Sequence, residues 1–213
     1  MRSDAEKRDS GDYFRLLSDV NEPDPRWKGL VRFDERGGTR PLTIDDRHAV
    51  LAELSLSDAV PDEVTIQFDT ARNLLLYSWH AYRFIPVAEL QAYRTVEMAL
   101  RVRFGLGPDA RPGMSKLLRR AVRDGLLKDD GFRQHHRMCE ERRYHDEFMR
   151  QLRPDAAPLE LPADVRAYAK VIADTIPSLR NRLAHGGSTL NPGGVLTLEI
   201  CRDLIDQLFP SKQ

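Results

Sequence analysis

The 213-residue chain has little of what would place it in several common classes of protein. It has only two cysteines, Cys139 and Cys201, which are too few for a disulfide framework. It has no run of about 18 apolar residues, so we expect no transmembrane helix and no membrane partner. Residues 1–9 are polar, and we expect no signal peptide there. Together these absences predict a cytoplasmic protein.

The chain also has no excess of charge of one sign. Lys and Arg number 33, as do Asp and Glu, which excludes a nucleic-acid coat protein that is cationic throughout. The charges are distributed unevenly, because residues 1–69 hold 10 basic and 16 acidic side chains, whereas residues 101–153 hold 14 basic and 8 acidic ones. The basic middle region is either a surface for RNA or a face that docks the acidic N-terminal region.

Apolar residues recur at helical spacing from residue 61 onward, and this pattern predicts an all-α fold. We expect a bundle of four main helices over residues 61–213, preceded by a small, partly irregular N-terminal extension over residues 1–60. The helices are expected at residues 61–84, 86–104, 115–125, 132–150, 163–175, 178–185 and 196–209. The helix at 132–150 has few apolar residues, so it should run over the surface.

The extension itself should contain little regular structure. A short hairpin is expected between Leu30 and Ile44, because Gly37 and Gly38 separate two short apolar stretches. Thr43 should then cap a short helix that ends near Leu54. Further along the chain, three prolines mark an extended connector before residue 163, and Pro177 should kink or restart the helix that follows.

The residues best suited to chemistry lie within residues 176–186, which read IPSLRNRLAHG. On a helix, Asn181 and His185 share one face, and the long side chain of Arg180 can reach it. Histidine exchanges protons near neutral pH, and arginine presents a forked, permanent charge that suits a phosphate. Asparagine can hold an imidazole tautomer or a ribose hydroxyl. Because RNA carries its own nucleophile, the 2′-hydroxyl, this set fits RNA cleavage without a metal ion.

The same three residues also fit a purely structural role. A histidine before a glycine is often a C-terminal helix cap, and an Arg-Asn pair near a helix end can serve packing alone. The spacing does not decide between these interpretations.

Arg180-Asn181, followed by Ala184-His185-Gly186, resembles the Arg-x4-6-His signature of the HEPN superfamily, the higher eukaryotes and prokaryotes nucleotide-binding domains. Residues 93–100, which read YRTVEMAL, resemble the Arg-x-x-Glu-x-x-Leu pattern of an earlier helix in such bundles. The short helix near residues 115–127 and the final helix also agree with the family's arrangement, so the resemblance covers roughly residues 61–210.

The resemblance implies an all-α homodimer in which the motif helices of two protomers meet near a two-fold axis. It implies a metal-independent endoribonuclease that leaves a cyclic phosphate, of the kind found in toxin–antitoxin and phage-defence systems, with an antitoxin as a further partner. Arg180, Asn181 and His185 would be catalytic, and no cofactor or metal is expected. The alternative is a non-catalytic HEPN-type module that binds RNA or a nucleotide and acts as a scaffold.

Three further groups of residues are secondary candidates. Glu97 either supports the motif, as an acidic residue does in some HEPN proteins, or pairs with Arg94 or Arg101 on its own helix. The basic residues that would track RNA are Arg119, Arg120 and Arg123. His and Cys residues, which are common metal ligands, also recur at His135, His136, Cys139 and His145. Their spacing matches no zinc module, so a solvated helix is the better interpretation.

Overall fold

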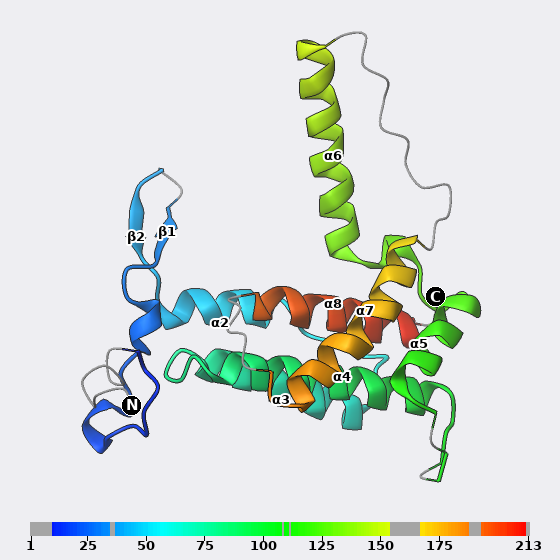
Figure 1. Ribbon diagram of the computed structural model, residues 1–213, viewed down its shortest axis with the longest axis horizontal. Helices are drawn as coiled ribbons and strands as arrows, with labels where there is room; N and C mark the ends of the chain where they lie inside the picture. The colour runs from blue at the N-terminus through cyan, green and yellow to red at the C-terminus, as the bar shows by residue number, and fades with distance from the viewer. Residues whose placement is uncertain are drawn as a thin grey trace.

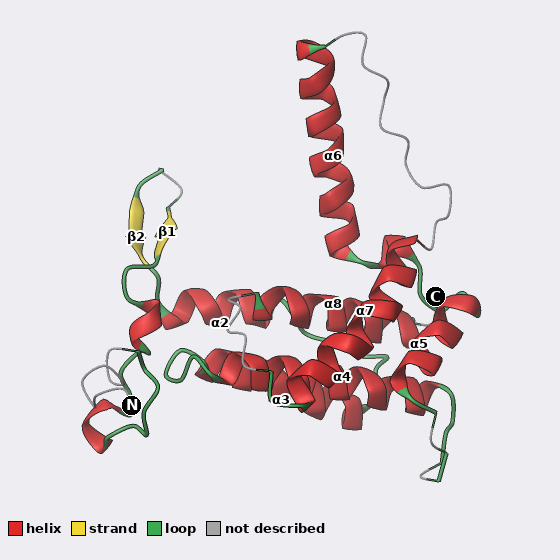
Figure 2. Cartoon of the chain, in the orientation of Figure 1, coloured by secondary structure: helices red, strands yellow, loops and turns green. Residues whose placement is uncertain are grey.

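The computed structural model describes residues 10–34, 37–107, 109–110, 112–153, 167–187 and 193–211. Its described part is mostly helical, with one small two-stranded sheet, which confirms the all-α class (Figures 1 and 2). The α-helices are α2 (Ile44–Ala52), α3 (Asp62–Tyr77), α4 (Phe84–Arg103), α5 (Met114–Arg123), α6 (Arg133–Leu152), α7 (Ala167–Ala184) and α8 (Gly194–Leu208). Within this part no helix has the length and apolar character needed to cross a membrane.

Helices α3, α4 and α8 lie side by side, and α7 crosses them diagonally (Figure 1). On α3 the buried residues are Val64, Phe68, Ala71 and Leu75, a spacing that puts them on one face. Burying each large side chain of this kind contributes roughly 1.5–3 kcal/mol to stability. Helix α8 begins in close contact with α3, since a Cβ on Gly194 would come within 2.8 Å of the Leu75 side chain. This packing therefore fixes the position of α4, which carries several candidate functional residues.

The N-terminal region contains the expected hairpin, with β1 (Val31–Phe33) antiparallel to β2 (Thr39–Pro41). Thr43 caps α2 as predicted, through a capping box that it forms with Asp46. Trp27 is buried in the same core as the bundle, and its ring lies 4.8 Å from that of Tyr82. The division at residue 60 stays a prediction, although side chains from both sides of it share one core.

The turn between α3 and α4 differs from the sequence prediction. One helix was expected to reach Phe84, but α3 ends at Tyr77 and Phe84 begins α4. The N-terminal region holds this turn, because the Asp24 N–H donates to the Trp79 carbonyl (2.7 Å) and the Asp24 carboxylate accepts the Tyr82 N–H (3.0 Å). A buried carboxylate from a distant part of the chain thus supplies contacts that local periodicity does not reveal.

Helix α6 forms where a helix was predicted and buries none of its residues, but it projects away from the bundle instead of running over its surface (Figure 1). Its base is anchored, because the N–H of Arg133 donates to the Asp203 carboxylate (2.8 Å). Helix α7 runs through Pro177 without a break, and the Asp129 carboxylate accepts the N–H groups of Tyr168 and Ala169 near its start. The predicted connector prolines and residues 163–166 lie outside the described residues.

Candidate functional site

The motif residues lie at the C-terminal end of α7. The His185 N–H still donates to the Asn181 carbonyl (3.0 Å), which keeps the two residues one helical turn apart. The chain then leaves the helix through Gly186, whose φ of +84° is one that L-residues rarely adopt. At Gly187 a Cβ would meet the Arg182 carbonyl oxygen at 2.7 Å. The helix therefore ends at Ala184, and the two glycines carry the chain away directly after His185, which is exposed.

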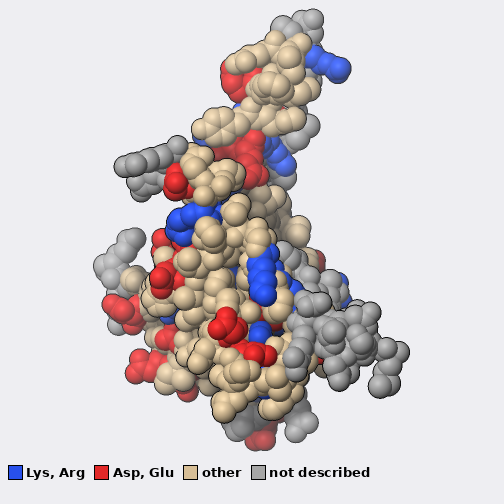
Figure 3. Space-filling model, turned by 90° about the vertical axis from the view of Figure 1, so that its left-hand side faces the viewer, with Lys and Arg blue, Asp and Glu red and all other residues tan. Residues whose placement is uncertain are grey.

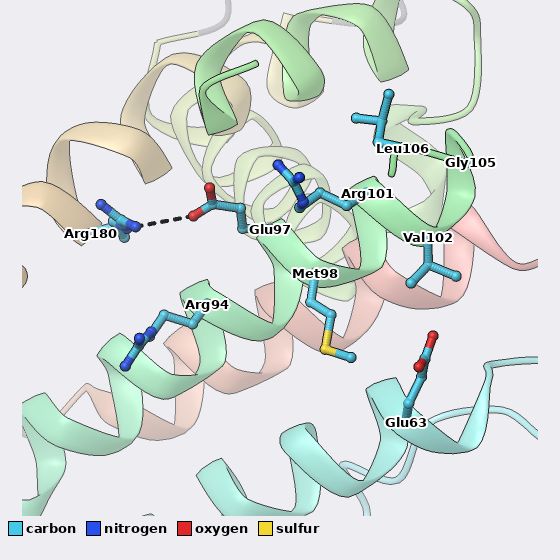
Figure 4. Close-up of a pocket in the computed structure, with 9 residues that line it drawn as sticks. All are labelled: Glu63, Arg94, Glu97, Met98, Arg101, Val102, Gly105, Leu106 and Arg180. Atoms are coloured by element: carbon cyan, nitrogen blue, oxygen red, sulfur yellow. Dashed lines mark hydrogen bonds and ion pairs between the residues drawn. The ribbon is translucent and has the colours of Figure 1, made fainter. Parts of the chain in front are cut away.

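Arg180 forms an ion pair with Glu97 on α4, as Figure 4 shows. Its Nη2 lies 3.1 Å from the Glu97 Oε2, and its Nη1 donates to the Asn181 Oδ1 (3.2 Å). Both side chains are partly covered, with exposed fractions of 33% for Arg180 and 24% for Glu97. Glu97 thus pairs with the motif arginine and not with Arg94 or Arg101 on its own helix.

Asn181 and His185 differ from Arg180 in their exposure. Both are exposed, and the His185 imidazole has no hydrogen-bonding partner among the residues that the structure describes. The Asn181 side chain accepts one hydrogen bond, from Arg180. An accessible amide therefore stands beside a guanidinium that a carboxylate orients, and an accessible imidazole lies one helical turn after Asn181.

An open hollow of about 600 Å³ adjoins the Arg180–Glu97 pair (Figure 4). One face of α4 forms most of its wall, with contributions from the start of α3, from α7 and from the turn after α4. Its lining residues are Glu63, Arg94, Glu97, Met98, Arg101, Val102, Gly105, Leu106 and Arg180. The size is within the range of sites for small molecules. The sequence left open whether Glu97 supports the motif or pairs along its own helix, and it indicated no role for Glu63 and Met98.

A part-buried polar contact joins α4 and α8. The Thr197 hydroxyl donates to the Glu89 Oε1 at 2.8 Å. Burial raises the pKa of Glu89, while the hydrogen bond from Thr197 and the charge of Arg182 act in the opposite direction. Glu89 was not among the residues predicted from the sequence. Its place between Ile85 and Ala92, which are both buried, was the signal that a carboxylate lies close to the core.

The three basic residues predicted to track RNA all have acidic neighbours. Arg119 pairs with Asp174 of α7 (2.9 Å), and Arg120 and Arg123 both lie 3.3 Å from Asp124. Figure 3 draws the opposite side of the molecule, away from α5, and there basic and acidic side chains are also interspersed. RNA would have to compete with these carboxylates, so the RNA-tracking role stays a prediction.

The histidines and the cysteine of α6 do not gather around one point. The Cys139 Sγ lies 3.5 Å from the His135 Nε2, and that ring is 4.0 Å from the Asp129 carboxylate. Across the described residues, no group of three or more His, Cys, Asp or Glu side chains is arranged to hold a metal ion. These contacts fit the base of a surface helix.

Comparison with known proteins gives no match: no family model, no curated protein and no solved structure is similar to this chain. The resemblance to the HEPN superfamily therefore rests on the motif residues and on their helical setting.

Proposed function

We propose that the protein is a HEPN-type endoribonuclease that cleaves RNA without a metal ion. One observation carries the proposal. Arg180 of α7 pairs with Glu97 of α4 beside an open hollow, and the exposed residues Asn181 and His185 follow Arg180 at the end of α7. A fixed cation, an amide and an accessible imidazole at one helix end are what attack by a 2′-hydroxyl requires.

In the proposed reaction, His185 accepts the proton of the 2′-hydroxyl. The bond from the 2′-oxygen to phosphorus forms, and the bond from phosphorus to the 5′-oxygen breaks. A protonated imidazole delivers a proton to the departing 5′-oxygen. The products are a 2′,3′-cyclic phosphate and a 5′-hydroxyl. Arg180 donates to the non-bridging oxygens, where negative charge increases in the transition state. Glu97 is a positioning residue that orients Arg180, and Asn181 orients either His185 or the ribose.

A homodimer would complete this acid–base scheme. One imidazole that has taken the proton must give it to an oxygen on the other side of the phosphorus, whereas two histidines can share the two roles. The dimer implied by the HEPN resemblance would bring a second His185 to the same phosphate across a two-fold axis.

The test is cleavage of RNA in EDTA by purified wild type, His185→Ala and His145→Ala. His145 is an exposed histidine on α6, so it is the matched control. Loss of an acid–base group should lower the rate by about 10²–10⁴-fold in His185→Ala and leave the control unchanged. A 2′-deoxy substitution at the cleaved nucleotide should abolish cutting. Undiminished cleavage by His185→Ala, or product ends other than cyclic phosphate and 5′-hydroxyl, would contradict the proposal.

A second candidate function is favoured by the bonding of Arg180. Its guanidinium already contacts Glu97 and Asn181, so an incoming phosphate must compete with both. This arrangement suits a non-catalytic module that holds RNA or a nucleotide and acts through a protein partner, such as an antitoxin. Expression in a bacterial host separates the two functions: a free ribonuclease should stop growth in a His185-dependent manner, and a scaffold should not.

A further inference from the structure

The hollow beside the Glu97–Arg180 pair has a chemical division of its own. Residues 94, 97 and 101 form one row on α4, and residues 94, 98 and 102 form the neighbouring row, so a single broad face of the helix lines it. The first row carries charge at each position. The second continues from Arg94 into the apolar residues Met98 and Val102. Both rows begin at Arg94, at the end of the hollow where Arg180 also lies (Figure 4).

Of the arginines that line this hollow, Arg94 is the one whose guanidinium makes no hydrogen bond or ion pair with a described residue. Arg180 is held by Glu97, and Arg101 donates to the carbonyls of Gly107 (3.3 Å) and Ala110 (2.6 Å). Arg94 is exposed and makes no hydrogen bond or ion pair with any described residue. Its charge is therefore available to an anion that enters beside Arg180.

The remaining wall suits a flat, partly apolar group with a hydrogen-bond donor. Met98, Val102 and Leu106 are partly buried and supply the apolar surface. Glu63, exposed in the first turn of α3, lines the hollow and makes no hydrogen bond or ion pair with a described residue. In Figure 4 Met98 lies between Glu63 and Arg94, and Val102 lies beside Glu63. A carboxylate is an acceptor only, so it selects groups that donate, such as the exocyclic amino group of a base.

We infer that this hollow is a nucleotide subsite for the RNA strand, a step that rests on the proposed function and deepens it. Arg94 binds a phosphate neighbouring the one that Arg180 contacts. The base packs on Met98 and Val102, and Glu63 accepts a hydrogen bond from its amino group. The subsite therefore takes adenine, cytosine or guanine in preference to uracil, whose one donor on that edge, the N3–H, is flanked by two carbonyl oxygens that repel a carboxylate.

The experiment measures binding without cleavage, so that it does not depend on catalysis. The probes are fluorescein-labelled 2′-O-methyl oligonucleotides of adenosine, cytidine or uridine, which lack the free 2′-hydroxyl. Fluorescence anisotropy is recorded over a range of salt concentrations. Arg94→Gln should weaken binding of all three probes about five- to tenfold and reduce the slope of log K against log salt by about one. Arg103→Gln, an exposed arginine on α4 outside the hollow, is the control and should change neither.

Glu63→Gln tests the base contact separately. An amide can donate as well as accept, so this variant should bind the uridine probe nearly as well as the other two, whereas wild type should prefer adenosine and cytidine by about fivefold or more. Asp62→Asn, the neighbouring acidic residue outside the hollow, should keep the wild-type preference.

The outcomes separate this inference from the proposed function. If wild type cuts RNA but Arg94→Gln behaves like Arg103→Gln, the subsite is wrong and the nuclease stands. If binding depends on Arg94 and no RNA is cut, the nuclease is wrong and the subsite stands. Wild type that binds none of the three probes, or that shows no base preference, would overturn the subsite as described.

Discussion

Helices α4 and α6 are each 20 residues long, yet the chain uses them in opposite ways. Helix α4 buries eight of its residues in the centre of the bundle, and α6 buries none of its own. Contacts hold α6 near its base, where the Arg133 N–H meets Asp203 and Arg137 pairs with Glu199. Phe132, the residue before α6, is fully buried.

The difference explains why the candidate site is on α4. A helix without tertiary packing is only marginally stable in water, whereas one enclosed by α3, α7 and α8 has a fixed backbone. The backbone of such a helix fixes where the residues of its open face start, as it does for Arg94 and Glu97. On α6, His135 and His136 lie at the anchored base, and His145, on the projecting part, lacks this support.

The largest expected effect is a difference in stability between apolar truncations in the two helices. Leu100→Ala on α4 removes a fully buried side chain and should lower the free energy of unfolding by about 2–5 kcal/mol. Leu152→Ala on α6 removes one that is 62% exposed and should change it by less than about 0.5 kcal/mol. Urea denaturation followed by circular dichroism measures both. Equal losses would show that α6 packs against something in solution.

A proline in α6 should have an intermediate effect, confined to that helix. Arg143→Pro removes a backbone donor and costs the helix about 3 kcal/mol locally, so the turns beyond it should unravel and the helical signal should fall. Because these turns bury nothing, the thermal midpoint of the bundle should move by only about 2 °C or less. Thermal scans at 222 nm give both quantities. A large drop in the midpoint would mean that α6 stabilises the bundle.

The smallest expected effect concerns the tie between the N-terminal region and the start of α4. The hydrogen bond from Arg83, with help from Arg26, lowers the pKa of Asp12 to about 2, although burial acts in the opposite direction. A lowered carboxyl pKa means that the contact stabilises the fold above about pH 4 and is lost as the pH falls toward 2. The protection factors of the amides of residues 10–24, which correct the exchange rates for their intrinsic pH dependence, should therefore fall over this range in wild type. In Asp12→Asn they should already be low at neutral pH, while Asp146→Asn on α6 should match wild type.

Much of the local structure was predictable because its causes are local. Helices α5, α6 and α8 lie within about two residues of their expected positions. The signals are local: apolar periods with nearby glycines for α5 and α8, and a polar stretch free of glycine and proline for α6. Thr43 capped its helix as expected for the same reason. The end of α3 was misplaced because a residue 58 positions away, Asp24, holds the turn at Tyr82.

The candidate site divides along the same line. By itself the sequence determined that Arg180, Asn181 and His185 share the end of a helix and that glycine follows them, because helical pitch and glycine's freedom at positive φ are local properties. Only the tertiary structure decided that Glu97, 83 residues earlier, pairs with Arg180, and that Glu63 and Arg94 line the hollow beside them. Periodicity states which face of a helix is buried. Which faces meet depends on how all the helices pack together, and a single sequence window does not contain that information.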